Sequence, residues 1–198
     1  DIADLLHAEL VVEEKLDGAN VAIWRDDSGR IDCSLRSGPG AMDRARQLGP
    51  LRAWVAGHDE ALRAVVDRSS VLYAEWLLLS HSVRYDRLPS YLAVLDLWRE
   101  VGGFASLEER NNACGAARLT TPPELWRGVS DNVKPVEALL GPSTWGEYEM
   151  EGVVVRRVAE GAPRMAKLLR PGFDRIDDRM WEAGRPRNRL AEGEVSWR

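Results

Sequence analysis

Lysine is rare in this protein, and one of its few lysines lies in an unusual place. The sequence has 27 Lys and Arg residues, of which only Lys15, Lys134 and Lys167 are lysine. Lys15 interrupts a largely apolar run, VVEEKLDGANVAI, over residues 11–23. Arginine stays protonated in proteins, whereas lysine can lose its proton in a suitable site and then act as a nucleophile. We therefore treat Lys15 as a candidate for covalent chemistry.

Four strand-like apolar segments carry a charged residue inside them or at one end. They are EEKLDGAN around Lys15, YAEWL with Glu75, EGVVVRR with Glu151 and AKLLR with Lys167. If these strands pair into one sheet system, two lysines, several carboxylates and arginines line a cleft. Carboxylates hold a divalent metal directly or through its waters, while Lys and Arg neutralise phosphate oxygens. The combination therefore indicates phosphate chemistry.

The elements expected to position these residues are short strands, with helices inserted between pairs of them. Apolar alternation predicts strands at residues 10–16, 19–25, 31–36, 71–79, 91–98, 151–158 and 164–170. Helical apolar spacing predicts helices at 42–67 with a break near Gly57, 105–118, 131–140 and 173–183, with TTPPELW as a connection. We expect the first three strands to form a β-meander and the last two a hairpin. This order favours an α+β fold with antiparallel sheets.

Composition is that of an ordinary soluble globular protein. With 198 residues and 44% hydrophobic content, the chain can bury one substantial core. No apolar run is long enough for a transmembrane helix and residues 1–20 lack the layout of a signal peptide, so we expect a cytoplasmic protein. Cys33 and Cys114 stand outside any CxxC pair, which favours two small buried hydrophobes over a disulfide or zinc site.

The net charge of -5 is unevenly distributed. Residues 156–198 contain 11 Lys and Arg against 7 Asp and Glu, whereas the rest of the chain is acidic. A basic C-terminal portion suits a phosphate-rich partner, and a solvated arginine-rich surface explains the same asymmetry. We expect one domain over residues 1–198, with a loop-like tail from 184 to 198. Because the sequence has no initiator Met, we interpret it as trimmed or as part of a longer polypeptide.

Five segments in order resemble the motifs of the covalent nucleotidyltransferase superfamily, which contains DNA ligases, RNA ligases and mRNA capping enzymes. EKLDGAN is similar to motif I, YAEW to motif III, YLAVLDLW to motif IIIa, EGVVVRR to motif IV and AKLLR to motif V. The resemblance extends from Glu13 to Arg170. It implies a ligase adenylation domain, an antiparallel α+β nucleotidyltransferase fold similar to ATP-grasp.

Within this superfamily the sequence most resembles ATP-dependent RNA ligases. DNA ligases and capping enzymes typically have x-Arg after the motif I glycine, whereas RNA ligases often have x-Asn, as in Ala19-Asn20 here. The other two groups also need an OB-fold barrel after motif V. Only 28 residues follow Arg170, so we expect no OB-fold domain in this sequence.

The resemblance implies that Lys15 attacks the α-phosphorus of ATP, forms lysyl-AMP and expels pyrophosphate. The AMP then passes to a 5′-phosphate RNA end, which a 3′-hydroxyl attacks to seal the strand. Glu151 and Lys167 are implied as further catalytic residues, and Asp17, Glu75 and Glu151 as ligands of Mg²⁺ or Mn²⁺, partly through water. A free lysine amine is largely protonated at neutral pH, so we expect Lys15 to be inactive without metal.

The resemblance also implies a nucleotide site built from all five segments. Glu14 and Leu16 are expected to contact the base largely through their backbone, and Leu95 and Val154 to pack on adenine. Contacts to sugar or phosphate are assigned to Asn20, Arg36 and Glu75, and Arg156 and Lys167 are also assigned to the nucleotide site.

Two positions depart from the family pattern and leave alternatives open. Leu95 stands where many relatives stack an aromatic residue on adenine, and Arg170 follows two leucines where motif V often has Lys-x-Lys. Whether Arg170 replaces that second lysine stays open. The alternatives are a DNA ligase or capping-type nucleotidyltransferase, or a catalytically silent nucleotide-binding module. The expected partner is RNA with 5′-phosphate and 3′-hydroxyl ends, together with a fused or recruited end-healing kinase or phosphatase.

Overall fold

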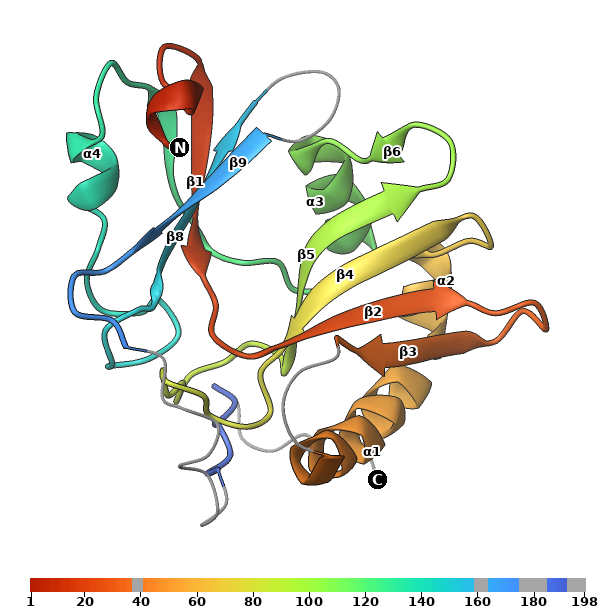
Figure 1. The fold of residues 1–198 in the computed structure, drawn as a ribbon. Coiled ribbons are helices and arrows are strands. Elements are labelled where there is room, and N and C mark those ends of the chain that lie inside the picture. The colour runs from red at the N-terminus through yellow and green to blue at the C-terminus, as the bar shows by residue number, and fades with distance from the viewer. Residues whose placement is uncertain (37–40, 159–163, 175–184, 192–198) are drawn as a thin grey trace.

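Two antiparallel sheets lie side by side in the molecule (Figure 1). The computed structural model describes residues 1–36, 41–158, 164–174 and 185–191. Among them, one sheet has four strands in the order β7-β1-β8-β9, which span Glu124–Val129, Glu9–Lys15, Gly152–Arg157 and Arg164–Leu169. The other has five in the order β3-β2-β4-β5-β6, which span Ile31–Leu35, Ala19–Arg25, Ser70–Trp76, Leu92–Arg99 and Gly103–Phe104. The predicted α+β class with antiparallel sheets is confirmed.

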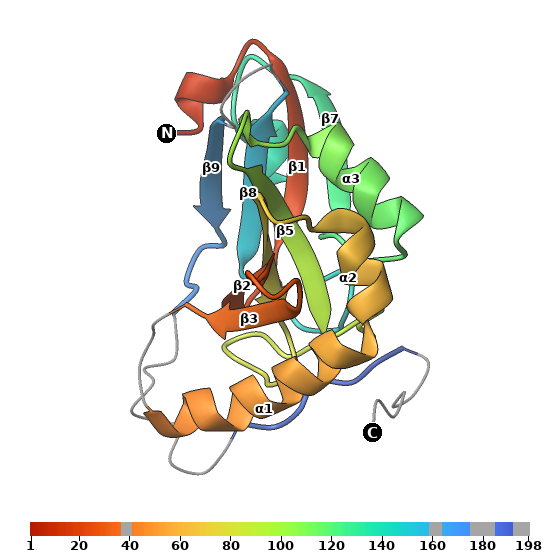
Figure 2. The ribbon, with the colours of Figure 1, turned by 90° about the vertical axis from the view of Figure 1, so that its right-hand side faces the viewer.

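Helices pack around the sheets. They are a 3₁₀ turn at Ala3–Leu5 and helices α1 (Ala41–Gly57), α2 (Asp59–Val65), α3 (Leu107–Ala116) and α4 (Lys134–Glu137). Figure 2 shows α1 and α2 on one side of the five-stranded sheet. The predicted break near Gly57 is confirmed, since α1 ends there. None of the helices in the described part of the chain is long and apolar enough to cross a membrane.

The main core lies between α1, α2 and the five-stranded sheet. Side chains alternate along β4, so that Leu72 and Trp76 are buried in this core. Trp54 of α1 packs edge-on against Trp76, with 6.3 Å between the ring centroids. Glu75 lies on the opposite face of β4. The alternation therefore directs one face of the strand to the core and leaves Glu75, with Val71 and Tyr73, on the half-buried opposite face.

The β-meander predicted for the first three strands is wrong. β1 pairs with β7 and β8 in one sheet, whereas β2 pairs with β3 and β4 in the other. Asp17 and Gly18 therefore link two sheets and do not form a hairpin turn. Their N–H groups donate to the Tyr85 hydroxyl at 2.8 Å and to Glu75 Oε1 at 2.9 Å. Gly18 is required because a Cβ there would lie 2.5 Å from the Trp76 carbonyl oxygen.

Other elements agree with the sequence or differ at their ends. The hairpin is confirmed as the antiparallel pair β8 and β9, although its turn lies outside the described residues. TTPPELW was expected as a connection but runs into β7, which covers the edge of β1. The helix expected at 131–140 is only the short α4, and β4 ends at Trp76 rather than residue 79. Residues 175–183 of the last expected helix lie outside the described residues.

Candidate active site

Lys15 lies at the end of β1, where the chain leaves the four-stranded sheet. Its Nζ donates to Glu151 Oε2 at 2.6 Å. The side chain of Lys15 is 12% exposed and that of Glu151 is 1% exposed, so the ion pair is largely removed from water. The pairing of Lys15 with Gly152 across β1 and β8 brings the two residues together. A Cβ at Gly152 would lie 2.1 Å from the Leu168 carbonyl oxygen, so this glycine lets β9 approach closely.

Two further carboxylates surround this ion pair. The Gly18 N–H donates to Glu75 Oε1 at 2.9 Å, and the Val83 N–H donates to Asp17 Oδ2 at 2.7 Å. Burial raises the pKa of Glu75 to about 7, with Lys15 acting against the shift and the carboxylates of Asp17 and Glu151 adding to it. Burial and then the charge of Glu151 raise the pKa of Asp17 to about 6. The site therefore holds more negative charge than the Lys15 ammonium alone balances.

The chemistry of these side chains fits a hard divalent cation. Asp17, Glu75 and Glu151 offer only oxygen ligands, which Mg²⁺ and Mn²⁺ prefer. The pKa values of Asp17 and Glu75 are raised because their ionised forms are disfavoured by burial and by neighbouring carboxylates, and a nearby cation would favour those ionised forms. Within the described ranges, no three His, Cys, Asp or Glu side chains converge closely enough to hold a metal ion directly. Ligation partly through water is the arrangement compatible with this spacing.

The strand register assigns several predicted residues to the face of the sheet that carries Lys15. Val154 pairs with Glu13 on one side and with Lys167 on the other, so these three residues share that face. Val153 is fully buried in the smaller core on the opposite face. Lys167 is exposed. Of the two neighbouring valines, Val154 is therefore the one on the side of the proposed nucleotide.

Glu14 points its side chain away from Lys15. Its carboxylate accepts hydrogen bonds from the Ser143 hydroxyl at 2.5 Å and from the Thr144 N–H at 2.9 Å. Burial raises the pKa of Glu14, against these two hydrogen bonds. Leu16 is buried in the main core. Both side chains are therefore engaged within the protein, and the contact of the Glu14 and Leu16 backbone with the base stays a prediction.

The residues expected near sugar and phosphate lie on neighbouring strands of the five-stranded sheet. Asn20 pairs with Glu75 across β2 and β4, and its Nδ2 donates to the Ala74 carbonyl at 3.5 Å. The Arg36 N–H donates to the Asn20 carbonyl at 2.8 Å, and the Arg36 side chain is exposed. Leu95 is half-buried and lies in a bulge of β5.

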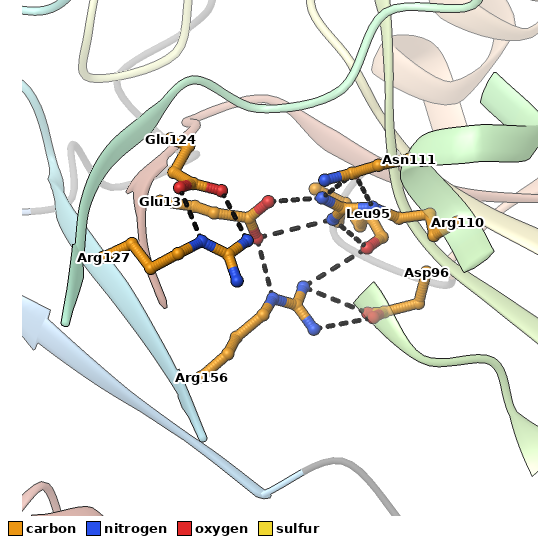
Figure 3. Close-up of polar contacts among 8 residues, drawn as sticks. All are labelled: Glu13, Leu95, Asp96, Arg110, Asn111, Glu124, Arg127 and Arg156. Atoms are coloured by element: carbon orange, nitrogen blue, oxygen red, sulfur yellow. Dashed lines mark hydrogen bonds and ion pairs between the residues drawn. The ribbon is translucent and has the colours of Figure 1, made fainter. Parts of the chain in front are cut away.

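A buried network of charges around Glu13, which shares a strand face with Lys15, ties the two sheets together (Figure 3). Glu13 lies between two guanidinium groups: Arg110 of α3 donates to both its oxygens, and Arg156 Nε donates to Oε2 at 2.7 Å. Arg156 also bonds to Asp96 Oδ1 of β5 at 2.7 Å. The Leu95 carbonyl accepts from both arginines, at 2.7 Å and 3.2 Å. The network joins β1, β8, β5 and α3 at one point.

Sequence reasoning missed three members of this network, namely Glu13, Asp96 and Arg110. The signal for Glu13 was its position two residues before Lys15, on the same strand face. Arg156 was expected to contact nucleotide, and in the structure its guanidinium is buried and engaged by protein oxygens.

Arg170 follows the end of β9 and does not continue the strand face of Lys167. Its N–H donates to the Glu151 carbonyl at 3.0 Å. Its guanidinium lies over the ring of Phe173, 5.2 Å from the centroid. Backbone contact with Glu151 thus joins the ends of the two segments that resemble motifs IV and V.

Two antiparallel sheets that place a strand-end lysine among buried and half-buried carboxylates are the features expected of a nucleotidyltransferase domain. The sequence profile of the RNA ligase family matches residues 8–169. The chain therefore belongs to the RNA ligase family. No curated protein matches it.

Solved structures of an RNA ligase from Naegleria gruberi have a similar fold. The apo form of a lysine-to-alanine variant is 18% identical, with a TM-score of 0.61 over 85% of this chain and 51% of that chain. A second such variant with ATP and Mn is 17% identical, with a TM-score of 0.60 over 85% and 52%. A glutamate-to-alanine variant with AMP and Mn is 17% identical, with a TM-score of 0.60 over 85% of this chain and 52% of that chain. The chain thus spans about half the length of these proteins.

Proposed function

We propose that this chain is the adenylyltransferase domain of an ATP-dependent RNA ligase and that Lys15 is its nucleophile. The observation that carries the proposal is the contact of Lys15 with Glu151 at 2.6 Å, beside the buried carboxylate of Asp17 and the half-buried carboxylate of Glu75. Membership of the RNA ligase family supports it. The ATP and Mn bound to a similar solved ligase support the choice of nucleotide and cofactor.

The first step requires Lys15 to give up its ion pair. A nucleophilic amine needs its lone pair, so Lys15 must release a proton and leave Glu151 before it attacks. The amine then forms a nitrogen–phosphorus bond to the α-phosphorus of ATP, while the bond to the bridging oxygen of pyrophosphate breaks. Lys15 comes from a strand end fixed by β8, so its Nζ is held within a short reach of Glu151 and the approaching phosphate.

Asp17, Glu75 and Glu151 are proposed to hold Mg²⁺ or Mn²⁺, partly through water. A cation held there would attract the carboxylates that otherwise engage Lys15 and would neutralise phosphate charge. The exposed Lys167, on the same sheet face, is proposed to contact the phosphates directly.

Other residues are proposed to bind the nucleotide. Val154 and Leu95 pack on adenine, the backbone of Glu14 and Leu16 contacts the base, and Asn20, Arg36 and Glu75 contact sugar or phosphate. Arg156 is proposed to support the nucleotide site indirectly, by holding Leu95 in place. Its guanidinium already donates to Glu13, Asp96 and the Leu95 carbonyl. It fixes the bulge at Leu95 relative to β8.

In the later steps, AMP passes from Lys15 to a 5′-phosphate RNA end, and a 3′-hydroxyl end displaces it. An end-healing kinase or phosphatase, fused or recruited, would supply such ends. A cytoplasmic location is part of the same prediction.

Labelling with ATP tests the proposal. The protein is incubated with α-labelled ATP and Mg²⁺, and a denaturing gel reports covalent label. We expect label on the wild type and on Lys134→Ala, and none on Lys15→Ala. Lys134 is the matched control because it is one of only three lysines and lies on α4, outside the site. Label that persists in Lys15→Ala contradicts the assignment of the nucleophile.

Ligation assays test the choice of nucleic acid. Strands with 5′-phosphate and 3′-hydroxyl ends are supplied as RNA or as DNA, with ATP and Mg²⁺. We expect sealing of RNA. Sealing of nicked DNA without sealing of RNA contradicts the proposed substrate, while leaving the lysyl-AMP step intact.

A further inference from the structure

Residues 185–191 lie beyond the part of the chain that the family profile matches, yet they pack against the loop between β4 and β5 (Figure 1). Isolated bridges pair Leu79 with Arg187 and Leu88 with Leu190. The Ser80 N–H donates to the Pro186 carbonyl at 2.9 Å. We call residues 185–191 the C-terminal strap. The sequence suggested a loop-like tail here; the strap belongs to no helix or named strand, but it forms hydrogen bonds with the loop along much of its length.

Asn188 is the anchor of the strap. It is 1% exposed. Its side-chain Nδ2 donates to the Leu77 carbonyl at 2.8 Å, and its Oδ1 accepts from the Tyr85 N–H at 2.9 Å. Its backbone N–H donates to the Leu78 carbonyl at 3.0 Å, and its carbonyl accepts from the Tyr91 hydroxyl at 3.2 Å. The side chain and backbone of this one buried residue together bind the start, the middle and the end of the loop.

The loop held by Asn188 in turn holds the residue two positions after Lys15. The Tyr85 hydroxyl oxygen accepts from the Asp17 N–H at 2.8 Å, and the Val83 N–H donates to the Asp17 carboxylate at 2.7 Å. Tyr85 is fully buried, so its hydroxyl has a fixed position. Tyr85 therefore connects the strap to Asp17, because its backbone N–H donates to Asn188 and its hydroxyl accepts from Asp17.

These contacts matter because the chain between β1 and β2 has no sheet ladder of its own. Residues 16–18 belong to neither strand, so their backbone position depends on bonds from outside the sheets. Two of those bonds come from the loop that Asn188 anchors. A small displacement of a reacting group lowers a rate sharply, and supporting contacts that lock its position prevent this.

We propose that Asn188 and Tyr85 are positioning residues for the adenylylation of Lys15, which makes the C-terminal strap a part of the active-site structure. The inference rests on the proposed function. The strap acts by holding the loop that positions Asp17. Loss of these contacts therefore slows the attack of Lys15 on ATP but leaves the protein's contacts with the base in place.

Two matched tyrosine variants test this inference in the full chain. Tyr85→Phe removes the hydroxyl that accepts from Asp17, and Tyr91→Phe removes a buried hydroxyl that bonds to the same asparagine but not to Asp17. The single-turnover rate of label transfer from α-labelled ATP is measured at saturating ATP and Mg²⁺, well below each variant's Tm. We expect about a tenfold lower rate for Tyr85→Phe, and a rate within about twofold of wild type for Tyr91→Phe.

The ATP dependence separates positioning from general damage. We expect the ATP concentration that gives the half-maximal rate to change by less than about twofold in Tyr85→Phe, because the nucleotide contacts remain. Asn188→Ala is expected to show the same slow rate with the same ATP dependence. If that variant fails to fold, the tyrosine pair alone decides.

The outcomes are distinguishable from failure of the proposed function. An unchanged rate in Tyr85→Phe, or equal losses in both tyrosine variants, overturns the positioning role while the wild type still forms its adduct. A wild type that forms no adduct overturns the proposed function, and this inference with it.

Discussion

At the scale of single residues, the site concentrates buried negative charge around one amine. Glu151 pairs with Lys15, and Asp17 and Glu75 lie close enough for their carboxylates to influence one another. Burying carboxylates costs free energy unless positive charge is nearby. The cost is greatest when all of them are ionised, and a cation bound among them would lower it.

Glu75 makes this cost measurable as a function of pH. Its folded pKa of about 7 lies above the ordinary value of 4.5, so the folded protein holds the proton more tightly than the unfolded chain. The stabilising effect of that proton is present below about pH 4.5 and is lost as the pH rises through about 7. In metal-free buffer, Glu75→Gln should therefore gain stability relative to wild type between pH 5 and pH 8, by on the order of 1–3 kcal/mol.

Urea unfolding of both proteins at pH 5 and pH 8 measures the difference directly. The Gly18 N–H can still donate to the glutamine oxygen, so the comparison isolates the charge. The same stability difference at both pH values would contradict a raised pKa at Glu75.

At the scale of elements, the Glu13 network fixes the two sheets against each other and against α3. Both arginines share the Glu13 carboxylate and the Leu95 carbonyl, and removing one leaves buried acceptors short of a donor (Figure 3). Breaking a buried ion pair from one side is much more costly than removing an exposed one.

Arg110→Met should therefore lower the free energy of unfolding by roughly 3 kcal/mol. Arg127→Met is the matched control, because Arg127 is 44% exposed and its pairs with Glu9 and Glu124 lie at the surface. We expect it to lose less than about 1 kcal/mol. Urea unfolding at pH 7 compares the two, and equal losses would show that the network does not hold the sheets together.

Most elements and the β8–β9 hairpin could be predicted from the sequence, but the pairing partners of β1 could not. Asp17-Gly18 has the composition of a hairpin turn, which predicts that β1 and β2 pair. In the structure β1 pairs instead with β7 and β8, which occupy both of its edges. Gly18 packs closely against the Trp76 carbonyl of the other sheet. β7 itself escaped notice because its side chains do not alternate between apolar and polar.

At the scale of the whole molecule, residues far apart in sequence form one site. The motif residues could be predicted because they lie in short segments of recognisable order. Tyr85, Arg110 and Asn188 could not, because no local pattern marks a residue whose partners lie tens of positions away. Their roles follow only from the tertiary contacts.

The central claim is that Lys15 becomes covalently linked to AMP. Intact-mass measurement of the protein after incubation with ATP and Mg²⁺, followed by peptide mapping, tests it most directly. The account predicts a mass increase of one AMP per chain, located on the peptide that contains Lys15 and absent in Lys15→Ala. No mass increase in the wild type, or AMP located on another residue, would contradict it.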